Sequence, residues 1–94
     1  MSPALRTIPS AHYDQGSDVL YVSVGRAREG DAVEQLKGVV LRYLFACNEP
    51  IGATVFGYRA KGWSHDRETL AALIADHIRT APQVVENAIL AAAP

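Results

Sequence analysis

Disulfide chemistry is missing from this sequence of 94 residues, because it contains a single cysteine, Cys47. Small secreted domains commonly depend on several disulfides, so one cysteine favours a reducing cytoplasm. We also find no basic N-terminal segment before an apolar run, and therefore expect no signal peptide. The longest apolar run is a few residues, well short of the roughly 18 needed to span a bilayer. We expect a cytoplasmic protein of bacterial type with no membrane partner.

An excess of charge of one sign is missing as well. The 9 lysines and arginines nearly balance the 10 aspartates and glutamates, which gives a formal net charge of −1. Nucleic-acid-binding domains usually carry a strong basic excess, so we do not expect nucleic acid as a partner. Weak RNA binding stays an alternative that depends on scattered basic residues beside tyrosines. These are Arg26, Arg28, Arg42, Arg59 and Lys61.

The residues that are present describe a folded α+β domain. A hydrophobic fraction of 49% with 20% charged residues is ordinary for a globular chain, and the length fits a single domain over 1–94. Before Trp63 the sequence is rich in Val, Ile, Tyr and Phe in short runs, and after it Ala and Leu dominate. Strands followed by helices are typical of an antiparallel sheet with helices packed on it.

The β-like part, about 7–58, predicts an antiparallel β-meander of four to five strands. Its runs are separated by short segments rich in Gly, Asn, Asp and Pro, as expected for successive hairpins. The predicted strands are Thr7–Tyr13, Asp18–Val24, Asp31–Leu36, Val39–Ala46 and Ile51–Tyr58.

The helical segment, about 64–92, predicts one helix or a helix pair. Ser64 or Asp66 is suited to cap the first helix, and Pro82 is suited to the first turn of a second. The first helix has an apolar stripe at helical spacing, and the second is almost entirely apolar on one side. The stripe residues are Leu70, Leu73, Ile74, His77 and Ile78, and those of the second helix are Val84, Val85, Ala88 and Ile89.

The stretch YDQGSDVLY holds a cluster of functional-looking side chains, Tyr13, Asp14, Asp18 and Tyr21. Aspartate, serine and glycine between two strand runs are typical of a turn, where their side chains bond nearby backbone groups. Paired carboxylates also suit acid–base catalysis or a hard cation. We interpret the cluster as a hairpin corner, with a small-ligand-binding protein or an enzyme as the alternative.

This stretch, followed by VEQLKGVVLRY and IGATVF, resembles the small bacterial domain-of-unknown-function family 2283. The resemblance covers about 13–56 and implies a β-meander with a helical addition but no established activity. It also suggests an antitoxin-like role beside a protein partner. The segment LFACNEP looks longer than the family's turn, and Thr54 stands where the family has a glutamate. The matching residues are Tyr13, Asp14, Asp18, Leu20, Tyr21, Gly38, Val39, Leu41 and Gly52.

Other motifs predict neither catalysis nor a cofactor. The consecutive Ser64, His65 and Asp66 resemble a hydrolase triad, but adjacent residues rarely form the required chain of hydrogen bonds. The histidines and Cys47 match no zinc spacing, and the glycines of GRAREG lack the Lys-Ser/Thr of a phosphate loop. We therefore expect no catalytic residues, no metal and no cofactor.

The sequence has more apolar residues than one sheet face and one helix can bury between them, and this surplus predicts self-association. A soluble monomer seldom exposes a contiguous apolar patch, and an isologous dimer would cover it. We expect a non-catalytic interaction module that forms a homodimer and has room for a protein partner. The expected interface residues are Val40, Leu44, Phe56, Val85 and Ile89.

Overall fold

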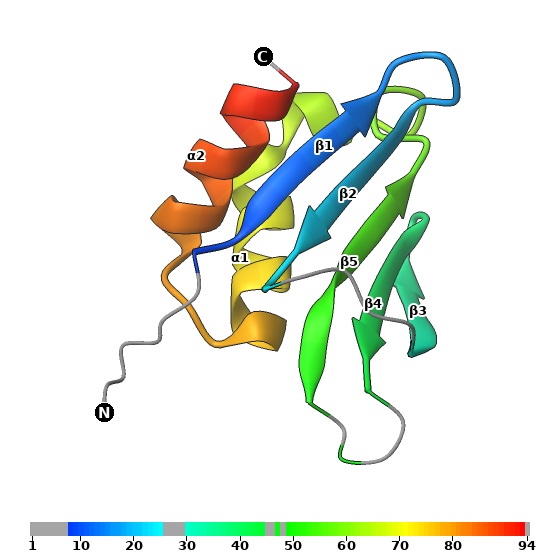
Figure 1. Ribbon diagram of the computed structural model, residues 1–94. Helices are drawn as coiled ribbons and strands as arrows, with labels where there is room; N and C mark the ends of the chain where they lie inside the picture. Colours follow the sequence, from blue (N-terminus) through cyan, green and yellow to red (C-terminus); the bar gives the residue numbers. More distant parts are fainter. Residues whose placement is uncertain (1–7, 26–29, 45–46, 48, 94) are drawn as a thin grey trace.

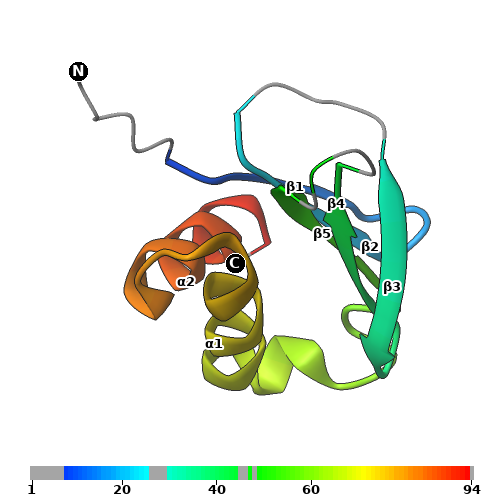
Figure 2. The same cartoon turned by 90° about the horizontal axis from the view of Figure 1, so that it is seen from below.

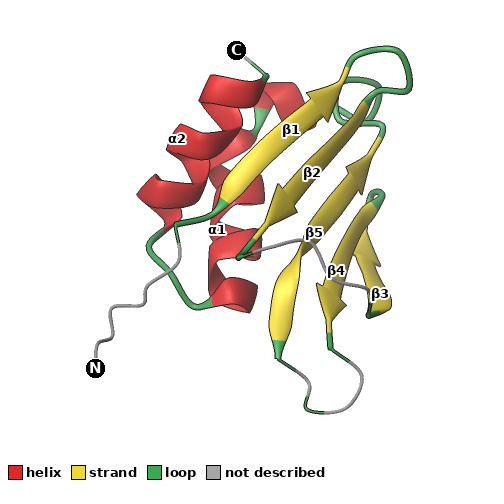
Figure 3. Cartoon of the chain, in the orientation of Figure 1, coloured by secondary structure: helices red, strands yellow, loops and turns green. Residues whose placement is uncertain are grey.

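The computed structural model describes residues 8–25, 30–44, 47 and 49–93, and in this part of the chain five strands form one antiparallel sheet with two helices beside it (Figure 1). The α+β class and the C-terminal helix pair are therefore confirmed. The strands precede both helices in the chain, and Figure 3 distinguishes the strands from the helices by colour. The strands are β1 (Ser10–Asp14), β2 (Val19–Ser23), β3 (Asp31–Leu36), β4 (Val39–Tyr43) and β5 (Pro50–Phe56); a 3-10 turn η2 (Trp63–His65) precedes α1 (Arg67–Ile78) and α2 (Pro82–Ala92).

The strand order is β1-β2-β5-β4-β3, which corrects one part of the predicted meander. Three connections are hairpins between neighbours, as expected, but the connection from β2 leads to the far edge of the sheet, and β5 returns to pair with β2. This order places β2 and β5, the strands with the most buried residues, next to each other inside the sheet. The observed order therefore buries these two strands. The short lengths of the connections do not by themselves indicate this order.

Gly52 permits the close packing of β5 against β2. Its φ is 149°, and a Cβ at this position would lie 2.1 Å from the carbonyl oxygen of Val22. The register between β4 and β5 also shifts here, because Arg42 pairs with Gly52 while Tyr43 pairs with Pro50. Such a bulge with glycine is typical of a bend in an inner strand.

Both helices cover the same face of the sheet (Figure 2). Side chains of α1 and α2 pack on the residues of β2, β4 and β5 that point to this side, and Tyr58 and Trp63 close one end of the core. The predicted helical stripes are thus oriented toward the sheet. The fully buried members include Leu20, Val39, Val55, Tyr58, Leu70, Ile74, Val85 and Ile89.

The helix boundaries follow from local chemistry. Asp66 is the N-cap of α1, and its Oδ1 accepts a hydrogen bond of 2.8 Å from the hydroxyl of Thr69. Arg79 ends α1 in the left-handed conformation, and Pro82 occupies the first turn of α2 as predicted. Neither helix, nor any other in the part of the chain that is described, is long and apolar enough to cross a membrane.

Candidate functional site

Asp18 fastens the β1–β2 corner to the turn that follows β5. Its Oδ1 accepts hydrogen bonds from the Tyr13 hydroxyl at 2.7 Å and the Arg59 amide at 2.9 Å, and its Oδ2 accepts one from the Ala60 amide at 3.0 Å. Its backbone carbonyl accepts two more, from the amides of Gly57 and Tyr58. We call this arrangement the Asp18 clasp. It joins segments about 40 residues apart, so Asp18 is a tertiary contact and not only a local turn cap.

The same hydrogen bonds set the electrostatics of the clasp. The Arg59 amide first, and then the Tyr13 hydroxyl and the Ala60 amide, lower the pKa of Asp18 below its ordinary value of 3.8. The hydrogen bond to Asp18 is in turn the main reason that the pKa of Tyr13 is raised. Three donors hold the carboxylate in its charged form, so it is poorly suited to exchange protons near neutral pH. The geometry therefore favours the hairpin-corner interpretation.

The other members of the predicted cluster lie apart from the clasp. Asp14 is exposed and accepts a hydrogen bond of 2.6 Å from the Ser17 hydroxyl, as expected for a turn. Tyr21 projects from the opposite face of the sheet, where its ring stacks on His12 with centroids 6.2 Å apart. The structure thus brings Tyr13 and Asp18 together, but the four side chains of the predicted cluster do not meet at one site.

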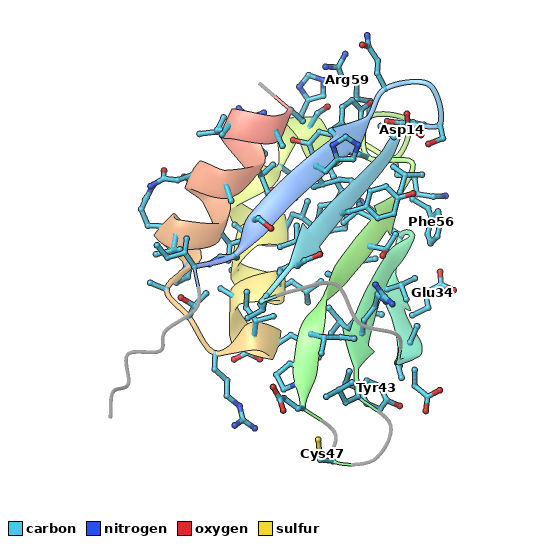
Figure 4. The ribbon with its side chains drawn as sticks, in the orientation of Figure 1. Asp14, Glu34, Tyr43, Cys47, Phe56 and Arg59 are labelled. Atoms are coloured by element: carbon cyan, nitrogen blue, oxygen red, sulfur yellow. The ribbon has the colours of Figure 1, made fainter. Side chains whose placement is uncertain are left out.

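Among the remaining candidate motifs, residues 26–29 of GRAREG lie outside the described residues, and the motifs that are described show no catalytic or metal-binding geometry. Within the described residues, Ser64, His65 and Asp66 form no chain of hydrogen bonds, and Asp66 instead engages Thr69. No group of three or more potential metal-ligating side chains is found in the described residues. His77 lies at the edge of the core, with Nε2 2.8 Å from the carbonyl oxygen of Arg42. Cys47 is a free, exposed thiol at the end of the molecule opposite Arg59 (Figure 4).

The sheet face opposite the helices is not covered by any described helix or loop (Figure 2). We call it the outer face. Two rows of paired residues on this face cross all five strands, and a third row brings Phe56 beside Val19 and Asp14. The second row consists of Ser10, Ser23, Gly52, Arg42 and Ala32. Tyr21 and Phe56 are 41% and 49% exposed. The first row consists of His12, Tyr21, Thr54, Val40 and Glu34.

The predicted interface residues lie in three different places in the structure. Val40 and Phe56 lie on the outer face, and Figure 4 shows Phe56 directed away from the helices. Val85 and Ile89 are fully buried in the core, so their assignment to an interface is corrected: the sheet of the same chain covers them. Leu44 is half-buried beyond β4, where its amide donates to the carbonyl of Glu49.

A pocket of about 500 Å³ lies beside the clasp, and sequence reasoning did not identify it. Its walls come from the turn after β5, from η2 and from the start of α1, so its residues are separated in the chain and form no motif. The sequence pattern of Ser64–Asp66 predicted a helix start and not a catalytic triad, and it did not indicate a pocket. The lining residues are Tyr58, Arg59, Ser64, His65 and Arg67.

No protein-family model, curated protein or solved structure matches this chain in the comparisons made. The resemblance in the segment 13–56 therefore stays a prediction. The structure shows an α+β domain with a sheet face that no described helix or loop covers, a hydrogen-bonded corner and an adjacent pocket.

Proposed function

We propose that this protein is a non-catalytic interaction module that binds a second copy of itself through the outer face. The observation that carries the proposal is the exposure of Tyr21 and Phe56 on a sheet face that no described element covers. Val40 and the buried Val19 and Thr54 lie around them in the first and third rows. Aromatic residues grouped on an exposed face are typical of binding surfaces.

The two ends of the first row support a second copy as the occupant. His12 lies at the β1 end of this row and Glu34 at the β3 end. Two such faces related by a two-fold axis parallel to the strands place β1 of one chain over β3 of the other. His12 then meets Glu34 of the second copy, and the symmetry repeats the contact. The polar ends of this row match the polar rim of a usual interface.

The size of the outer face indicates a weak dimer. Five strands at about 4.8 Å spacing and about 17 Å length give a projected area of about 400 Å² per chain. Stable specific interfaces bury about 800 Å² per partner, so the association should be reversible and dependent on concentration.

The exposed free thiol of Cys47 supports our placement of the protein in the reducing cytoplasm.

Sedimentation equilibrium of wild type and two matched variants tests the proposal. Phe56→Glu puts a charge beside Val19 on the outer face and should raise the dimer dissociation constant at least about tenfold. Leu90→Glu changes an exposed leucine of α2, 36% exposed, and should leave the constant unchanged. A wild type that stays monomeric up to millimolar concentration contradicts the proposal, as does equal weakening by both variants.

A further inference from the structure

Two buried donors without partners lie in the wall of the pocket beside the clasp. Tyr58 is fully buried, and its hydroxyl has no hydrogen-bond partner among the described residues. The Nε of Arg67 is also buried and has no partner in the described part of the chain, while its Nη1 donates to the carbonyl of Ser64 at 3.1 Å. Both residues line the same pocket. Buried polar groups nearly always form hydrogen bonds. Two donors that lack an acceptor at the same pocket therefore indicate a missing binding partner.

The chemistry of the walls defines that partner as a negatively charged hydrogen-bond acceptor. Arg67 Nε can only donate a hydrogen bond, and Arg59 contributes a second guanidinium, which lies 5.5 Å from the Tyr13 ring centroid. Ser64 and His65 add further polar groups. No carboxylate is among the residues that line this pocket in the described part of the chain. Arginine forks suit carboxylate and phosphate oxygens.

An adjoining hollow of about 350 Å³ limits how large the ligand can be. It shares Ser64, His65 and Arg67 with the pocket, but its other walls carry carboxylates. These carboxylates beside the pocket would repel the further phosphates of a long polyanion such as RNA more than they would a compact oxyanion. The acidic residues of the hollow are Asp66, Glu68 and Glu86.

We propose that the pocket formed by Tyr58, Arg59, Ser64, His65 and Arg67 binds a small oxyanion, the phosphate or carboxylate group of a ligand. The guanidinium groups of Arg59 and Arg67 hold its charge, and the Tyr58 hydroxyl donates to one oxygen. The clasp positions the pocket, because Asp18 accepts from the amide of Arg59 and so fixes the backbone that carries one of the two arginines. This binding site is separate from the outer face and does not depend on self-association.

An NMR titration of the full chain with inorganic phosphate, sodium acetate and sodium chloride at equal ionic strength tests the proposal. The Nε–H signal of Arg67 should shift and saturate with phosphate, with acetate or with both, and the stronger of the two identifies the group. Chloride should cause only a small shift without saturation. Shifts that are alike in all three salts, or that never saturate, would overturn the proposal.

Three variants make the test specific. Tyr58→Phe should lower oxyanion affinity by about tenfold, since it removes one hydrogen bond to a charged group. The free Tyr58→Phe protein should be at least as stable as wild type, because the buried hydroxyl has no partner. Arg67→Gln should abolish saturation, whereas Arg79→Gln, the same charge change at an exposed site, should bind as wild type does. Wild-type affinity in Tyr58→Phe, or equal loss in both arginine variants, argues against the assigned site.

Discussion

Asp14 and Asp18 lie four positions apart in one turn, yet their surroundings give them different roles. Asp14 is exposed and contacts Ser17, whereas Asp18 holds two backbone amides from a distant turn and the hydroxyl of Tyr13. Asp18 also has a φ of 59°, a conformation that aspartate tolerates better than most residues. The conformation and the acceptor geometry together explain why an aspartate suits this position.

Replacing Asp18 should weaken the fold much more than replacing Asp14. Asp18→Asn keeps the left-handed backbone but turns one acceptor oxygen into a donor that faces an amide. We expect it to lower the urea midpoint at pH 7 clearly, while Asp14→Asn should change it little. The folded-state pKa of Asp18 is depressed, so its stabilisation is complete above the ordinary value of 3.8 and is lost as pH falls through the lower folded value. The difference between wild type and Asp18→Asn should therefore shrink toward low pH, and a difference independent of pH contradicts this role.

At the scale of the elements, sequence patterns located the helices better than the sheet order. Pro82 and Asp66 marked the helix starts because residue preferences at helix ends are local in the chain, although the Asp66 carboxylate bonds the Thr69 hydroxyl and caps no backbone amide. The β2–β5 pairing and the clasp join distant segments, and nothing local in the sequence indicates which strand pairs with which. The pocket was missed for the same reason, since the orphaned hydroxyl of Tyr58 exists only after the core closes around it.

The end of α1 carries conformational strain that a single change should relieve. Arg79 caps the helix with φ 61° and ψ 52°, a region that costs a non-glycine residue about 1–2 kcal/mol. Arg79→Gly should raise the free energy of unfolding by about 0.5–1 kcal/mol, because glycine's greater entropy in the unfolded chain returns part of the gain. Thermal unfolding measures this, with Arg79→Ala as the control that keeps the strain. If the glycine variant is no more stable than the alanine variant, the claim that residue 79 is strained is wrong.

At the scale of the whole molecule, the two faces of the sheet have different environments. The helix pair seals the face that carries Leu20 and Val55, and the outer face carries Tyr21 and Phe56 into solvent. The sequence predicted excess apolar surface but assigned Val85 and Ile89 to it, because the helix pattern does not show that both helices pack on the same sheet face. The pocket lies with Arg59 and the β1–β2 corner, whereas Cys47 lies at the other end of the sheet (Figure 4).

The most direct measurement of self-association through the outer face is an isotope-filtered NOE experiment on a mixture of labelled and unlabelled chains. Contacts between chains should involve the ring protons of Phe56 and Tyr21, with His12 of one chain near Glu34 of the other. Contacts between chains confined to Leu90 and the exposed side of α2, or none at millimolar concentration, would contradict the proposed interface.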